Sequence, residues 1–65
     1  MTITKNIKDR VKKGFDIRIE ADGKFYWFYK NEVDDWCCDV YIDDELDECN
    51  FFSDDAEVIE EIELI

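Results

Sequence analysis

Histidine and proline are both missing from this chain of 65 residues, and glycine occurs only twice. Without histidine, the chain lacks the commonest general base of enzymes and the commonest zinc ligand. Without proline or a glycine- and serine-rich stretch, nothing marks a linker, so the sequence predicts a single domain over residues 1–65. A domain of this length buries only about 60% of the surface of its unfolded chain, which leaves little room for an enclosed active site. We therefore expect a protein that is not an enzyme and that holds no cofactor.

Long apolar runs are missing as well. No stretch approaches the roughly 20 apolar residues that cross a bilayer, and the basic N-terminal stretch lacks the hydrophobic region of a signal peptide. We expect a cytoplasmic protein without membrane contact. Cys37, Cys38 and Cys49 are odd in number and two are adjacent, which is typical of reduced thiols. The surrounding carboxylates are expected to raise the pKa of these thiols, because a thiolate adds one more negative charge.

The most informative absence is that of positive charge after Lys30. Residues 1–30 hold all eight Lys and Arg but only four of the nineteen Asp and Glu, and residues 31–65 hold the other fifteen. We call residues 31–65 the acidic half. A segment without internal counter-charge either stays solvated or meets a positively charged partner.

The acidic half is expected to be folded, because 46% of the chain is apolar and 15% aromatic, whereas disordered chains contain few aromatic residues. Self-repulsion at a net charge of −11 opposes compaction. The stability of so small a domain is marginal, so a partner or a homodimer interface would contribute to it.

The first 30 residues predict a helix followed by a β-hairpin. Ile3, Ile7 and Val11 recur at every fourth position, and Gly14 follows as a helix-ending residue, which indicates a helix over residues 3–13. Residues 15–20 and 24–30 alternate in polarity around Asp22-Gly23, the pattern of a hairpin.

Two registers are open to this hairpin. A loop of two residues pairs Ile19 with Tyr26, whereas a loop of three residues pairs Ile19 with Phe25. We favour the loop of three, because it gathers apolar side chains on one face and charged side chains on the other. Tyr26 and Phe28 would then point outward, either as a packing surface for a helix or as an exposed aromatic patch.

Residues 33–42 fit two structures. The alternation of residues 36–42 indicates a third strand, but Val33, Trp36, Cys37, Val40 and Tyr41 also have the spacing of a helix stripe. We favour the strand, because residues with high β-propensity follow one another there.

The remainder predicts a turn, a short strand and a helix. Residues 43–48 are expected to form an acidic turn, and residues 49–52 a short edge strand. Ser53 precedes acidic residues, which is typical of an N-cap. Ala56, Ile59 and Ile62 would face the core, with Val58 and Ile65 as further candidates. The predicted fold is therefore α+β, with an antiparallel sheet of three to four strands, a short N-terminal helix and an acidic C-terminal helix.

Metal sites are not expected. The run Asp43–Glu48 is rich in the oxygen ligands that calcium prefers, but an EF-hand also needs a turn glycine and a glutamate at its twelfth position, and this run has neither. Three cysteines without histidine leave a zinc site incomplete. The acidic field also repels nucleotides and nucleic acids, so direct binding of nucleic acid is not expected.

Carboxylates on folded elements can, however, imitate a nucleic acid. Alternate residues of a strand stand about 6.6 Å apart, and neighbours at i+3 and i+4 on a helix lie about 5 to 6 Å apart. These intervals are similar to the spacing of phosphates along a nucleic-acid strand. A rigid acidic surface can therefore occupy a DNA-binding groove much as a duplex does.

Small size, strong acidity, the aromatic strand Phe25–Tyr29 and the acidic segment Ser53–Ile65 give the chain a family resemblance. It resembles the DNA-mimic inhibitors of bacteriophages and mobile elements, which include uracil-DNA glycosylase inhibitors, anti-restriction proteins and some anti-CRISPR proteins. The resemblance implies a non-enzymatic inhibitor whose partner is a basic nucleic-acid-binding protein in the cytoplasm of a bacterial host. The alternative is an acidic protein-interaction module, such as an immunity protein, an antitoxin or an adaptor, that binds a basic surface without mimicry. A third reading is a domain whose acidity serves only solubility.

The candidate partner-binding residues are carboxylates that would replace phosphates, and aromatic side chains that would anchor the complex. The carboxylates are Asp34, Asp35, Asp39, Asp43, Asp44, Glu45, Asp47, Glu48, Asp54, Asp55, Glu57, Glu60 and Glu61. The aromatic anchors are Tyr26, Phe28 and Tyr41.

Overall fold

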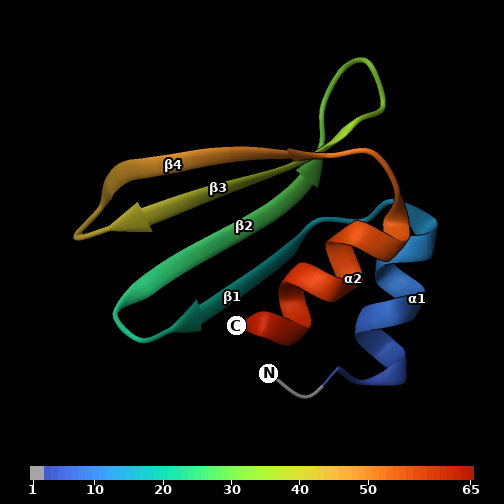
Figure 1. The fold of residues 1–65 in the computed structure, drawn as a ribbon, viewed down its shortest axis with the longest axis horizontal. Helices are drawn as coiled ribbons and strands as arrows, with labels where there is room; N and C mark the ends of the chain where they lie inside the picture. Colours follow the sequence, from blue (N-terminus) through green and yellow to red (C-terminus); the bar gives the residue numbers. More distant parts are fainter. Residues whose placement is uncertain (1–2) are drawn as a thin grey trace.

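A four-stranded antiparallel sheet with strand order β1-β2-β3-β4 forms the centre of the computed structural model, which describes residues 3–65 (Figure 1). The elements in chain order are α1 (Lys5–Lys13), β1 (Ile17–Ala21), β2 (Lys24–Lys30), β3 (Trp36–Ile42), β4 (Glu45–Phe52) and α2 (Asp55–Leu64). Both helices contribute to one core on one face of the sheet. The predicted α+β class is confirmed.

Both ends of α1 follow from its sequence. The Thr4 side chain accepts a hydrogen bond from the Ile7 N–H at 3.2 Å and caps the first turn. At the other end Gly14 adopts φ 77°, and the N–H groups of Gly14 and Phe15 donate to the carbonyls of Val11 and Arg10. These two hydrogen bonds form a Schellman motif, which needs a left-handed residue at the helix end. The predicted role of Gly14 is confirmed.

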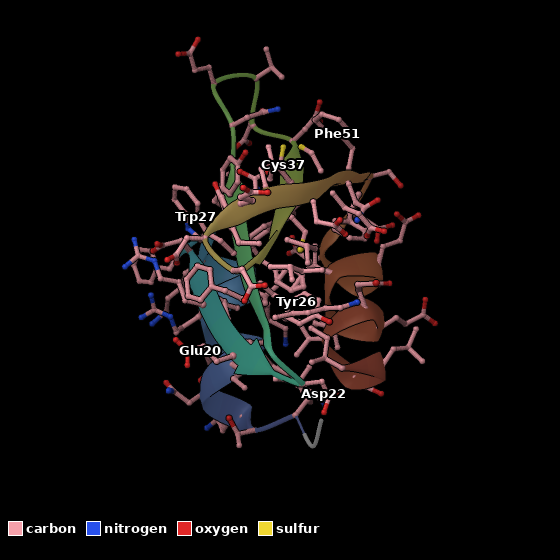
Figure 2. The ribbon with its side chains drawn as sticks, turned by 90° about the vertical axis from the view of Figure 1, so that its left-hand side faces the viewer. Glu20, Asp22, Tyr26, Trp27, Cys37 and Phe51 are labelled. Carbon is pink, nitrogen blue, oxygen red and sulfur yellow. The ribbon has the colours of Figure 1, made fainter. Side chains whose placement is uncertain are left out.

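The register predicted for the first hairpin is wrong. Asp22 and Gly23 form a loop of two residues with φ values of 53° and 75°, and Ile19 pairs with Tyr26. Positive φ at both positions is a type I′ turn, whose twist matches that of the flanking strands. Tyr26 and Phe28 therefore face the helices, and Phe28 is fully buried. Figure 2 shows Tyr26 toward α2 and Trp27 on the opposite side of the sheet.

The predicted third strand is confirmed as β3, but the acidic turn after it is shorter than expected. Only Asp43 and Asp44 turn the chain, with φ values of 52° and 65°, and β4 begins at Glu45. Aspartate tolerates the left-handed region better than most residues, which suits a tight turn here. A bulge follows, because the pairing with β3 shifts between Val40 and Tyr41.

The cap of α2 lies one residue later than predicted. Asp54 is the N-cap, and its side chain accepts from the Glu57 N–H at 2.9 Å. The Glu57 carboxylate accepts in turn from the Ser53 N–H and hydroxyl at 3.1 and 2.8 Å. Ser53 thus extends the cap instead of forming it. The predicted burial of Ala56 is wrong, because its side chain is exposed, whereas the predicted burial of Ile62 and the candidate Val58 is confirmed.

The core lies between the helices and one face of the sheet. Its buried members are Val11, Ile17, Ile19, Phe28, Trp36, Cys38, Val40, Val58 and Ile62. Ile3 and Ile7 pack at its border, which confirms the apolar stripe predicted for the first helix. Trp36 donates its indole N–H to the Asp55 carboxylate at 2.9 Å and so joins β3 to the first turn of α2.

Candidate partner-binding surface

The charge boundary of the sequence becomes a boundary in space. Strands β1 and β4 form opposite edges of the sheet, α1 contacts β1, and α2 contacts β4 (Figure 1). Lys30 ends β2, so the boundary falls between the two hairpins. The cationic residues therefore belong to one side of the molecule, and the acidic half forms the other.

The exposed surface of α1 is cationic. Lys5, Lys8, Arg10, Lys12 and Lys13 are all exposed, and Asp9 is the single carboxylate of this helix. Three of these cations lie in the last turn, where the helix dipole favours positive charge. This surface of α1 would repel a basic partner, so such a partner would have to approach another part of the molecule.

Strand β4 carries the most accessible carboxylates. It pairs only with β3, and every residue from Glu45 to Phe51 is exposed. In Figure 1 the tip of the β3–β4 hairpin projects away from the helices. Asp43, Asp44, Glu45, Asp47 and Glu48 follow one another along this hairpin, and none has a cationic partner within residues 3–65.

The loop between β2 and β3 is held by Asn31. The Asn31 side-chain oxygen accepts from the N–H groups of Val33 and Asp35 at 3.1 and 3.0 Å. Asp34 adopts φ 65° and lies 3.5 Å from the Lys30 ammonium. Asp34 and Asp35 are exposed, as predicted, and Lys30 partly neutralises the first of them.

The carboxylates of α2 divide into two groups. Asp54, Asp55 and Glu57 accept hydrogen bonds from within the chain, so they build the helix start as well as adding charge. Glu60 is exposed, and Glu61 is partly buried. The carboxylates of the first group have a structural role at the start of α2, whereas the exposed Glu60 carboxylate is accessible to a partner.

Two of the predicted contact residues are not accessible. Phe28 is fully buried beneath the helices, and Asp39 is only 9% exposed. The Asp39 carboxylate accepts a hydrogen bond from the Tyr29 hydroxyl at 3.1 Å. Tyr26 is partly buried against the core, so of the three predicted anchors only Tyr41 lies on a face without helices.

The face of the sheet opposite the helices is aromatic, and sequence reasoning missed it. We call this surface the open face. It comprises Arg18, Glu20, Phe25, Trp27, Tyr29, Cys37, Asp39, Tyr41, Leu46, Cys49 and Phe51, which the strand pairing brings into adjacent rows. Leu46 and Phe51 are 58% and 68% exposed. The sequence signal that could have revealed the open face is the loop of two residues at Asp22 and Gly23, since that register places Phe25, Trp27 and Tyr29 on the same face.

All three cysteines are free thiols, and the predicted rise of their pKa values is confirmed. Burial is the main cause for Cys37 and Cys38, and it raises the pKa of Cys38 to about 12. For exposed Cys49, a hydrogen bond to Asp39 raises the pKa first. The carboxylates were thus the expected cause but are the leading one only at Cys49.

The described residues 3–65 contain no group of three or more cysteine, aspartate or glutamate side chains placed to hold a metal ion. Over the same residues, neither helix has the length and apolar character needed to cross a bilayer.

Comparisons with protein-family models, with curated proteins and with solved structures found no match to this chain.

Proposed function

We propose that this protein is a non-enzymatic inhibitor that acts as an acidic mimic of a nucleic acid. It would place its acidic half in the basic nucleic-acid-binding groove of a host enzyme or defence protein, in the cytoplasm of a bacterial cell. The observation that carries the proposal is the arrangement of carboxylates on ordered elements of one side of the molecule, with the cations on the other.

Size and rigidity support this proposal. The molecule measures 29 × 28 × 15 Å, so its broad faces have the length of about eight base pairs at 3.4 Å each. The carboxylates belong to a strand, a turn of two residues and a helix, and fixed positions reduce the ordering cost of binding. Because the acidic hairpin has no internal cation, its field would steer a basic partner toward it.

Two triple variants of equal charge test the acidic surface. Glu45→Gln, Asp47→Asn and Glu48→Gln neutralise β4, whereas Asp9→Asn, Glu20→Gln and Asp22→Asn remove the same charge from α1 and the first hairpin. If each lost ion pair is worth about 0.7 kcal/mol, the β4 triple variant should bind its partner roughly thirty-fold more weakly.

The control triple variant should change affinity less than threefold, and the affinity of the unmodified protein should fall as salt is added. Isothermal titration against a partner captured from the host measures both effects. Equal losses for the two triple variants, or an affinity that is independent of salt, would contradict the proposal.

An acidic interaction module without mimicry is the second candidate. The open face favours it, because exposed aromatic area is typical of contacts between proteins and a phosphate backbone offers no equivalent. The two candidates differ in one respect: a mimic blocks the nucleic-acid site of its partner, whereas the module leaves that site free.

A further inference from the structure

Aromatic rings gather on the open face, where no helix covers them. The Trp27 and Tyr29 ring centroids lie 4.6 Å apart, and those of Phe25 and Tyr41 lie 6.2 Å apart. All four side chains are partly exposed, and exposed Leu46 continues the Phe25–Tyr41 row onto β4. A contiguous apolar patch of this kind marks a contact site more often than a single exposed residue does.

A carboxylate occupies the middle of these rings. Asp39 pairs with Trp27 on one side and with Cys49 on the other, and it is 9% exposed. The Tyr29 hydroxyl donates to it, but no lysine or arginine within residues 3–65 forms an ion pair with it. A charge in such a poorly hydrated position attracts a cation more strongly than an exposed charge does.

The chain already binds its own guanidinium group at the edge of this face. The Arg18 guanidinium lies 5.5 Å from the Trp27 ring centroid and 3.5 Å from the Asp16 carboxylate. The Trp27 indole donates to the same carboxylate at 3.3 Å. The surface therefore already holds a guanidinium over a ring and beside a carboxylate.

A recess with rings and a carboxylate lies next to the Arg18 side chain. This surface recess of about 560 Å³ is lined by Phe25, Trp27 and Tyr41, with Arg18 at one side and Asp44 at the other. Asp16 partly neutralises Arg18, whereas Asp44 and nearby Asp39 form no ion pair with any lysine or arginine of residues 3–65. The recess thus offers rings for stacking and a carboxylate for pairing.

We propose that this recess binds an arginine side chain from a basic protein segment. The inference rests on the proposed function, since the same basic partner supplies the arginine. Charge complementarity selects this occupant: a second copy of the chain would bring −11 against −11, and a nucleic acid would be repelled as well. Arginine is favoured over lysine because a planar guanidinium stacks on rings and pairs with carboxylates.

The two tryptophans make the test site-specific. Trp27 lies on the open face, and Trp36 lies on the helix side with its indole bonded to Asp55. A ¹⁵N-labelled sample is titrated with a deca-arginine peptide while both indole N–H signals are followed by NMR. The Trp27 indole and the amides of Phe25 and Tyr41 should shift, and the Trp36 indole should stay in place. Shifts confined to α2 and β4 would overturn the proposal.

Asp44→Asn and Asp43→Asn form a matched pair. Both residues belong to the same turn and have positive φ, which asparagine tolerates, but only Asp44 lines the recess. Asp44→Asn should weaken deca-arginine binding about fivefold, and Asp43→Asn less than twofold. Deca-lysine should bind the unmodified protein several times more weakly. Equal effects of the two variants, or equal affinities for the two peptides, would also overturn the proposal.

The peptide titration, combined with displacement of the natural partner by DNA, separates the arginine site from the proposed mimicry. Deca-arginine bound in the recess, together with a natural partner that DNA does not displace, supports the arginine site and contradicts mimicry. Displacement of the partner by DNA, with deca-arginine bound elsewhere, leaves mimicry in place and overturns the arginine site.

Discussion

The hydrogen bond between Tyr29 and Asp39, at the centre of the open face, affects the pKa of Tyr29. Burial first, and then the hydrogen bond to Asp39, which a tyrosinate could not donate, together raise the pKa of Tyr29 to about 12. Asp39→Asn should therefore lower the Tyr29 pKa toward its ordinary value of 10, whereas Asp44→Asn should leave it unchanged. The ¹³Cζ chemical shift of Tyr29, followed against pH, measures both.

The same shift has a consequence for stability. Because the folded-state pKa of Tyr29 lies above the unfolded value, its contribution is complete below pH 10 and is lost as the pH rises toward about 12. The Asp39→Asn variant should show a smaller loss over that range in urea unfolding. An ordinary pKa for Tyr29 in the unmodified protein would contradict the hydrogen bond.

Helix α2 depends on a cap made by its own carboxylates. Asp54→Ala removes the acceptor for the Glu57 N–H and should lower the free energy of unfolding by about 1 kcal/mol. Glu60→Ala deletes the same charge from an exposed position of the helix and serves as the control. Urea unfolding followed by circular dichroism compares them. Equal losses would show that charge, and not capping, determines the effect.

Most elements could be predicted from local patterns, but the register of the first hairpin could not. A loop of three residues would have made one face of the sheet apolar and the other charged. The sheet instead has Phe28 and Tyr26 toward the helices and Phe25 and Trp27 on the open face. Both faces of β2 are aromatic, so alternation within the strand could not decide between the registers.

Strand β4 shows a second limit of sequence reasoning. Glu45, Asp47 and Glu48 belong to residue types that are depleted in strands. Pairing with β3 overrides that preference, and the turn of two residues at Asp43 and Asp44 fixes where pairing begins. The sequence could predict an acidic side, because the charge boundary falls between two hairpins. It could not predict the open face, which depends on the register.

The whole molecule carries a net charge of −11 concentrated on one side. Repulsion among these carboxylates destabilises the folded state. Neutralising Glu45, Asp47 and Glu48 should raise the midpoint of thermal unfolding at low salt, because adjacent carboxylates on β4 and its turn no longer repel each other. Neutralising Asp9, Glu20 and Asp22 should raise it less, since α1 and the first hairpin also carry all eight Lys and Arg. Calorimetry at low and high salt measures both, and the difference should shrink as salt screens the charges. A lower midpoint for the β4 variant would contradict this electrostatic account.

Displacement by DNA tests mimicry most directly. The protein is immobilised, host proteins are allowed to bind, and bound proteins are eluted with a short DNA duplex or with polyglutamate of equal total charge at constant ionic strength. A mimic competes for the nucleic-acid site itself, so the duplex should release a nucleic-acid-binding protein at concentrations where polyglutamate does not. A captured partner that stays bound to the immobilised protein while it also binds the duplex would contradict the account.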